Sequence, residues 1–432
     1  MTWRTEEQIG GVLRGMAERA PEPEDDLVEL VAGRRRRRTR RRWRAAFAAA
    51  AVVAVIGAGT TLAAPFAHRG GEGRDTAVAL STDSPEDIAT RGGLRPGAGP
   101  APGMASEVWP AAVTTMPAEA SDGWMYRPVT ALGPTEILVT AESSFERAGR
   151  LEIYDTTARQ SRVLGQMPAP PGIAGYFPQD VEVGPGHIAW YGTRPNDDAE
   201  WADLWVLPRD GGIARQIAQI TGPIAKIAQI AVTADHIVWS LTGEEILYRV
   251  PLTGGAPEVV PGTEGLTLYA GSWAHRGPDQ LVNLETWETV RPTDASGVTS
   301  VRCGVEWCIG RSPAGLITFA IDGAGRRSVT SASERGSPGG IAPDIHGRFV
   351  EIDDGGPAIY DMSTGKRARI GTKTSEDGYH WGVGISSSPT STLYWPASKE
   401  ESGACLDGER GGEVPCPGAE IEVLNLLAVP GE

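Results

Sequence analysis

Residues that could do chemistry are few in this 432-residue chain, and the clearest of them are two histidines. His187 stands in VGPGHIAWYG (183–192) and His236 in VTADHIVWSL (232–241), at the same place in two similar stretches. A repeated residue of this kind is explained more simply as a strand-start side chain that bonds within its own unit than as a catalytic base.

Acidic pairs are the second kind of chemically capable residue. Asp197-Asp198 and Asp353-Asp354 could serve as acid and base, but both lie in predicted turns, where Asp side chains cap backbone groups. The chain has no G-x-S-x-G elbow, no HExxH and no phosphate-binding loop. We therefore predict no catalytic residue, no metal ligand and no cofactor.

The elements that position these residues form an internal repeat. LWVLPRDGGIARQI from Leu204 aligns with ILYRVPLTGGAPEVV from Ile246, and each reads as a strand, a turn and a second strand. A strand that often carries Trp precedes each unit. The mean spacing of about 45 residues is typical of four-stranded propeller blades. Weaker copies begin at Leu151, Gln280, Leu316, Ala358 and Glu420.

The segments LYRVPLTGG and LWVLPRDGG resemble blade signatures of bacterial TolB-like and WD40-like propellers. The resemblance covers residues 124 to 430 and implies an all-β propeller of seven blades. Six or eight blades stay open, because the fourth unit lacks the Gly-Gly turn and the seventh has a long insert. We expect Trp124–Leu132 to supply a strand to the last blade, which would close the ring. Propellers host many unrelated activities, so the fold alone implies none.

Four cysteines lie in the repeat region: Cys303, Cys308, Cys405 and Cys416. An even number in an exported domain predicts disulfides, with three connectivities open. Cys303 and Cys308 flank a tight turn between the first two strands of a blade, and Cys405 and Cys416 close a polar insert. We predict the pairings 303–308 and 405–416. The C-x4-C spacing with no nearby His makes a zinc site a poor alternative.

Three tryptophans fall outside the repeat pattern. Trp201, Trp287 and Trp381 are therefore candidates for an aromatic surface that binds a sugar or a peptide.

The N-terminal part of the chain predicts a membrane anchor. Ala45–Ala67 carries no charge, and as a helix of about 34 Å it would cross a hydrocarbon core of roughly 30 Å. The arginine run Arg34–Arg44 ends where this stretch begins, which predicts a cytoplasmic N-terminus. A cleaved signal peptide and a twin-arginine export signal are the alternatives.

Residues 1–44 form the predicted cytoplasmic segment. Ile9, Val12, Leu13 and Met16 follow at helical spacing and predict a contact for a cytoplasmic protein or the membrane surface. An amphipathic segment, an arginine run and one span together resemble membrane proteins of high-GC actinobacteria, some of them anti-sigma factors. The zinc-binding motif of that family is missing here.

The rest of the chain divides into two predicted parts. Residues 68–122 are rich in Gly, Pro and Ala and predict a flexible linker, followed by an extracytoplasmic propeller at 123–432. Residues 1–44 carry 12 Lys/Arg and 8 Asp/Glu, whereas residues 68–432 carry 28 and 47. The acidic body excludes nucleic acid as a partner of the propeller.

The sequence favours a non-catalytic, single-span membrane protein whose propeller binds or scaffolds a protein, peptide or glycan outside the cytoplasm. Two alternatives stay open. One is a glycan lyase or hydrolase of the cell envelope with a site in the propeller channel. The other is a sensor that signals through the N-terminal segment.

Overall fold

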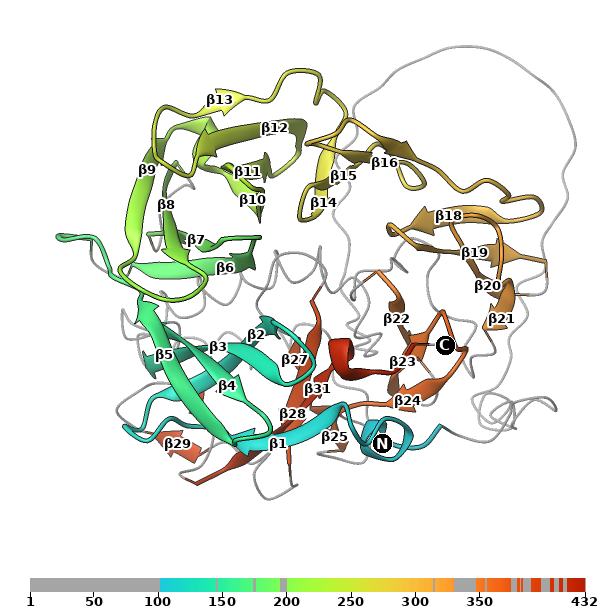
Figure 1. The fold of residues 1–432 in the computed structure, drawn as a ribbon, viewed down its shortest axis with the longest axis horizontal. Helices are drawn as coiled ribbons and strands as arrows, with labels where there is room; N and C mark the ends of the chain where they lie inside the picture. The colour runs from blue at the N-terminus through green and yellow to red at the C-terminus, as the bar shows by residue number, and fades with distance from the viewer. Residues whose placement is uncertain are drawn as a thin grey trace, which may run out of the picture.

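Seven β-sheets, or blades, form a ring in the part of the protein that the structure describes (Figure 1). The computed structural model describes residues 102–431 except 145–146, 174–175, 195–199, 314, 330–346, 354–355, 374–378, 381, 384–389, 398–404, 408–411 and 415–417. Within this part, the seven-bladed propeller predicted from the repeat is confirmed.

The first five blades each have four antiparallel strands in chain order. Blade 1 has β2 (Met125–Ala131), β3 (Glu136–Ser144), β4 (Arg147–Asp155) and β5 (Gln160–Gln166). Blade 2 has β6 (Phe177–Val183), β7 (His187–Thr193), β8 (Trp201–Pro208) and β9 (Arg215–Thr221). Blade 3 follows the short 3-10 helix η2 (Pro223–Ala225) and has β10 (Ile227–Val232), β11 (His236–Leu241), β12 (Glu244–Pro251) and β13 (Glu258–Val259).

Blades 4 and 5 have shorter strands. Blade 4 has β14 (Thr267–Ala270), β15 (Trp273–His275), β16 (Leu281–Asn283) and β17 (Thr289–Val290). Blade 5 has β18 (Thr299–Cys303), β19 (Trp307–Ser312), β20 (Gly315–Ala320) and β21 (Arg327–Val329).

The last two blades depart from the four-in-order pattern. Three strands of blade 6 are described: β22 (Phe349–Asp353), β23 (Pro357–Asp361) and β24 (Arg367–Arg369). Blade 7 has the order β27 (Gly382–Val383), β28 (Thr392–Pro396), β31 (Glu420–Asn425) and β1 (Val113–Pro117). Two small sheets, β25 (Thr372–Lys373) with β26 (Tyr379–His380) and β29 (Cys405–Asp407) with β30 (Gly412–Val414), and the 3-10 helix η3 (Leu426–Ala428), complete this region.

Strand β1 closes the ring, which corrects the expectation that Trp124–Leu132 would do so. β1 pairs with β31 from Val113↔Leu424 to Pro117↔Glu420. The chain then turns back, and Met125–Ala131 becomes β2, the innermost strand of blade 1. Both segments are plausible strands, but only the shorter one meets the edge of β31.

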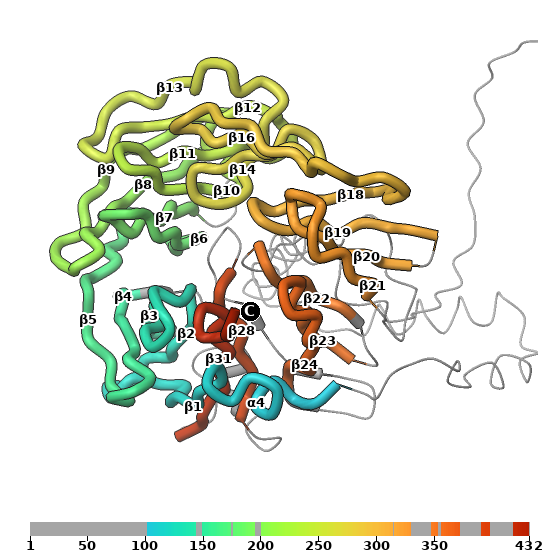
Figure 2. The backbone as a smooth tube through the Cα atoms, turned by 45° about the vertical axis from the view of Figure 1, so that its right-hand side comes forward, coloured from blue at the N-terminus to red at the C-terminus, as the bar shows by residue number. Residues whose placement is uncertain are grey.

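The folded part also begins earlier than the predicted boundary at residue 123. Helix α4 (Ala105–Val108) and β1 lie within the predicted linker 68–122. Met104 forms a bridge with Arg369, and Figures 1 and 2 show α4 beside β24. Trp109 anchors this segment because its buried ring packs edge-on against Phe349 at 6.2 Å.

One apolar cluster lies between each pair of successive blades, so the core is distributed around the ring. Strands alternate their side chains between the two neighbouring blades, and both faces of a blade are therefore buried. The second-strand tryptophans fill these layers: Trp190, Trp239 and Trp395 are almost completely buried.

The Gly-Gly turns that identified the repeat hold neighbouring blades together. Gly212 N donates to Leu164 O of blade 1 at 2.9 Å, and a Cβ on Gly211 would lie 2.9 Å from that same oxygen. In blade 3 a Cβ on Gly254 would lie 3.2 Å from Ile217 O of blade 2. Only glycine allows the turn of one blade to approach the outer strand of the previous blade so closely.

The two faces of the ring are defined by strand direction. We call proximal the face at which the innermost strand of each blade begins, and distal the opposite face. In an antiparallel blade, the turns between the first and second strands and between the third and fourth strands lie at the distal face. The turns between the second and third strands lie at the proximal face.

The predicted anchor and cytoplasmic segment lie outside the described residues. In the part of the chain that the structure does describe, no helix is long and apolar enough to cross a membrane.

Candidate functional site

Charged and aromatic side chains gather at the proximal face of blades 1 and 2. Arg150, near the start of β4, is the centre of the first group. Its guanidinium makes two bonds to the Asp122 carboxylate, at 2.6 and 3.0 Å, and its Nε donates to Glu152 Oε1 at 2.5 Å. The ring of Trp124 lies over the guanidinium, 4.5 Å from centroid to Cζ. One cation is therefore fixed by two anions and one aromatic ring.

The buried end of this group is a carboxylate–hydroxyl chain. Tyr126 Oη donates to Glu152 Oε2 at 2.8 Å and lies 2.7 Å from Ser161 Oγ. The Glu152 side chain is only 2% exposed, whereas that of Asp122 is 45% exposed. The chain of contacts thus runs from solvent at Asp122 to the interior at Glu152.

The pKa values follow from these contacts. The Arg150 guanidinium beside Asp122 holds the pKa of that carboxyl below its usual value. Burial, together with the nearby Glu152 carboxylate, raises the pKa of Tyr126 to about 12. Tyr126 is therefore a neutral hydrogen-bond donor at physiological pH, and not a base.

Two more polar contacts line the same face on the innermost strands. Arg127 Nη2 pairs with Glu142 Oε2 at 3.0 Å in blade 1. Gln179 Nε2 donates to Thr193 Oγ1 at 3.0 Å in blade 2. Both pairs lie where the first strand of a blade begins and the second strand ends.

Trp201 contributes the aromatic part of blade 2. Its ring packs edge-on against Tyr176, with centroids 6.4 Å apart, and the Arg194 guanidinium lies 4.7 Å from its centroid. Beneath it, the buried Asp203 accepts hydrogen bonds from Trp205 Nε1 at 2.8 Å and from Tyr176 Oη at 3.1 Å. Burial raises the pKa of Asp203 in spite of these donors. Asp203 is completely covered, so its role is to fix Tyr176 and Trp205.

We call this set the proximal cluster: Asp122, Trp124, Tyr126, Arg127, Glu142, Arg150, Glu152, Gln179, Thr193, Arg194 and Trp201. Arg150 and Arg127 each form an ion pair with an acidic residue of the same cluster, so their side chains are held in place before a ligand arrives. Fixed donors beside aromatic rings recognise polar partners with little ordering cost. Among the described residues, no group of three or more His, Cys, Asp and Glu could hold a metal ion.

The structure does not bring the three predicted tryptophans together. Trp201 belongs to the proximal cluster but is only 3% exposed. Trp287 lies in the β16–β17 turn, at the distal face, and is 47% exposed. Trp381 is outside the described residues.

The histidines and acidic pairs do not converge either. His187 and His236 begin the second strands of blades 2 and 3, and His236 N donates to Thr233 Oγ1 within its own blade. Asp197-Asp198 and Asp354 lie outside the described residues.

A disulfide joins Cys303 to Cys308 across the β18–β19 turn, which confirms that prediction. Cys405 begins β29, but Cys416 and the predicted bond between them lie outside the described residues. The predicted contact residues Ile9, Val12, Leu13 and Met16 also lie outside them.

Sequence reasoning missed most of the proximal cluster, although one signal was present. In RLEIYD, Arg150 and Glu152 stand two residues apart and therefore share one face of a strand. Opposite charges on the same face of a blade strand indicate a buried ion pair, because that face packs against the next blade and is not exposed to water.

The comparisons with known proteins identify no family for this chain. No protein-family model and no curated protein sequence matches the chain. The C-terminal WD40 domain of Sif2 is 9% identical over 74% of this chain and 99% of its own, with a TM-score of 0.38. A streptogramin B lyase is 10% identical over 72% of this chain and 97% of its own, with a TM-score of 0.37. An oligogalacturonate lyase in complex with manganese is 11% identical over 56% of this chain and 75% of its own, with a TM-score of 0.34.

Proposed function

We propose that the protein is a TolB-like, membrane-anchored propeller that binds or scaffolds a protein, peptide or glycan outside the cytoplasm, through the proximal face of blades 1 and 2. The observation that carries the proposal is the pairing around Arg150. Its charges are paired, the Asp122 side chain is 45% exposed, and Tyr126 stays protonated. This favours recognition over acid–base chemistry, which needs a group with a pKa near the working pH.

The compartment is inferred from the Cys303–Cys308 disulfide. Disulfides persist in oxidising surroundings outside the cytoplasm and are rare inside it. This supports an anchor at Ala45–Ala67 with the N-terminus in the cytoplasm and the propeller outside.

Site-specific photo-crosslinking tests the binding face. A crosslinking amino acid would replace the exposed Ser121, beside the Asp122–Arg150 pair, in the full-length chain in its native membrane. The matched control carries the same group at Ala158, an exposed position in the distal turn of the same blade. We expect a discrete crosslinked species from Ser121 only. Equal crosslinking from both positions, or crosslinking from Ala158 alone, would contradict the assignment of the proximal face.

Protease protection tests the orientation separately. Protease added to intact spheroplasts should degrade the propeller and spare residues 1–44, because the arginine run retains them inside. Loss of the N-terminal segment, or a soluble mature form without it, would refute the anchor while leaving the crosslinking result intact.

A further inference from the structure

The outer turn of blade 4 holds a tryptophan in a backbone conformation that tryptophan rarely adopts. Trp287 has φ 60°. The equivalent turn position is Gly365 in blade 6, with φ 73°, and Arg159 in blade 1, with φ 54°. The positive φ costs an L-residue roughly 1–3 kcal/mol, whereas glycine adopts it freely. Since glycine would form this turn more easily, the indole ring is not explained by the turn itself.

The Trp287 ring is partly exposed to solvent and packs against the backbone of a neighbouring loop. Trp287 is the one aromatic among the four large exposed apolar residues of the described chain; the others are Val163, Ile213 and Val259. The far edge of its ring lies against Gly262, where an added Cβ would be 3.6 Å from the indole Cη2. Gly262 itself has φ 78°, so the ring rests on a position that favours glycine.

Hydrogen bonds fix the turn that carries the ring. Asn283 Oδ1 accepts from Glu285 N at 2.9 Å and from Thr286 N at 3.0 Å, and Trp287 N donates to Asn283 O at 2.8 Å. The Glu285 carboxylate also accepts from Ala234 N of blade 3 at 3.2 Å. Binding of a ligand that stacks on Trp287 would therefore carry only a small entropic cost for ordering this surface.

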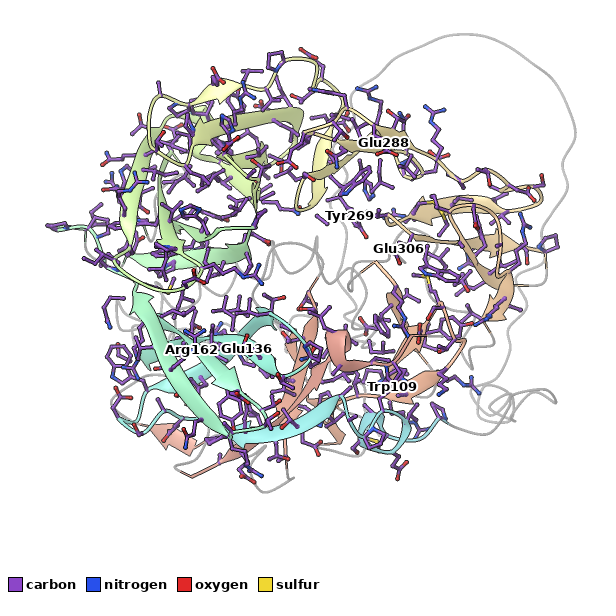
Figure 3. The ribbon with its side chains drawn as sticks, viewed as in Figure 1. Trp109, Glu136, Arg162, Tyr269, Glu288 and Glu306 are labelled. Atoms are coloured by element: carbon purple, nitrogen blue, oxygen red, sulfur yellow. A yellow bond between two sulfur atoms is a disulfide. The ribbon has the colours of Figure 1, made fainter. Side chains whose placement is uncertain are left out.

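The two segments that form this surface carry charge of one sign. The turn 283–288 and the supporting segment 262–264 contain Glu264, Glu285 and Glu288 and no Lys or Arg. Figure 3 labels Glu288 on blade 4. Residues 68–432 carry 47 Asp/Glu against 28 Lys/Arg, so the wider field also attracts cations.

We propose that this turn binds a basic segment of a partner protein, with a Lys or Arg side chain of the partner over the Trp287 ring and its charge near Glu288. A cation over an exposed indole contributes about 0.5–1 kcal/mol, and more when the contact is desolvated. The flanking carboxylates add to the attraction. A neutral sugar would stack on the ring but would gain nothing from the acidic surroundings. This surface is at the distal face and is independent of the proximal cluster.

Fluorine NMR of the full-length chain labelled with 5-fluorotryptophan tests the proposal. The resonance absent in Trp287→Gly identifies Trp287. Tetralysine should shift that resonance with a dissociation constant on the order of 1 mM, and salt should weaken the effect. Glu288→Gln should weaken binding about threefold. Tetralysine acetylated on every amine should leave the resonance unmoved.

The glycine variant also separates binding from folding. Trp287→Gly relieves the positive φ but loses the packing against Gly262, so its melting temperature should stay close to that of the wild type while binding is lost. Arg159→Gly is the matched control, because it relieves the same turn position in blade 1 and should leave tetralysine binding unchanged. A Trp287 resonance that tetralysine does not move, or that a neutral glucan oligosaccharide or the acetylated peptide moves equally, would overturn the proposal.

Discussion

The interface between blades 2 and 3 differs sharply from the interface between blades 4 and 5. The first contains 17 buried apolar residues, among them Trp239. The second contains five, and two of these are Cys303 and Cys308. Strands of blade 2 have seven or eight residues, whereas those of blade 4 have two to four. Where strands are long, a large apolar cluster holds the blades together. Where they are short, hydrogen bonds such as His275 Nε2 to Cys303 O at 3.0 Å supplement a smaller cluster.

Removing a second-strand tryptophan from blade 3 and another from blade 4 should give the largest contrast. Trp239 is fully buried, stacks on Tyr248 at 5.8 Å and donates to Ile224 O at 3.2 Å. Trp239→Ala should lower the free energy of unfolding by about 3–5 kcal/mol, because it leaves a large cavity. Trp273→Ala, at the first position of β15 in blade 4, should cost less because Trp273 is only partly buried. Urea denaturation of both variants measures the difference, and equal losses would break the comparison.

The disulfide should matter in the short-stranded interface alone. Replacing both Cys303 and Cys308 with Ala removes a short covalent loop, which we expect to cost about 2 kcal/mol. Hydrogen exchange should rise in β18 and β19 and stay unchanged in β11 and β12. The measurement compares oxidised wild type with the double variant, so that Cys405 and Cys416 are the same in both. Exchange that rises equally in all four strands would show that the two interfaces are not independent.

The glycine turns of the long-stranded interface should show a smaller effect. Gly254→Ala meets both a positive φ of 93° and the Ile217 carbonyl at 3.2 Å. Gly243→Ala meets a positive φ of 82° with nothing within 4 Å. Backbone strain alone costs about 1–2 kcal/mol, and the carbonyl contact should add about 1 kcal/mol to the loss in Gly254→Ala. Thermal unfolding of the two variants gives this difference directly, and identical losses would mean that the turn is not held against blade 2.

The smallest effect should be a pH dependence in the blade 4–5 interface. His275 stacks on Tyr269 at 4.5 Å, and its Nε2 bonds Cys303 O at 3.0 Å. Burial lowers the pKa of His275 below its usual value of 6.5. The unfolded chain therefore takes up a proton first as pH falls below 6.5, and the free energy of unfolding falls with it.

Replacing the histidine isolates this contribution. His275→Gln should lose stability less steeply than wild type between pH 6.5 and the lowered pKa. Parallel pH profiles of wild type and variant would refute the assignment.

The sequence was sufficient for the parts of the fold that repeat. Six strand–turn–strand units, the tryptophans of the second strands and the Cys303–Cys308 turn all follow from local patterns and are present in the structure. The seventh unit, from Glu420, was predicted wrongly, because β31 is followed by the 3-10 helix η3 and not by a strand. The closing strand was predicted wrongly, because its partner is chosen by pairing with β31 at the far end of the chain. No local pattern in VTTMP distinguishes it from the adjacent Met125–Ala131.

The candidate site was predicted less well than the fold. Trp201 was identified from its position outside the repeat, but its burial under Arg194 and Tyr176 depends on packing between strands. Asp122 lies in the connection before β2 and Arg150 lies in β4, 28 residues further along the chain, and the folding of blade 1 brings them together. A charged residue in an alternating strand normally indicates that its face of the strand is exposed to solvent. That inference fails in a blade whose two faces are covered by neighbouring blades.

The pairing of β1 with β31 also sets the order of events during synthesis. β1 leaves the ribosome before any blade exists, whereas its partner β31 follows only after the strands of blades 1 to 6 have been made. Until then the apolar side chains that blades 1 and 7 share, including Met116 and Val423, have no complete partner. The nascent chain must therefore carry an open ring with two unfinished edges, and chaperones that protect such edges would be needed until β31 arrives.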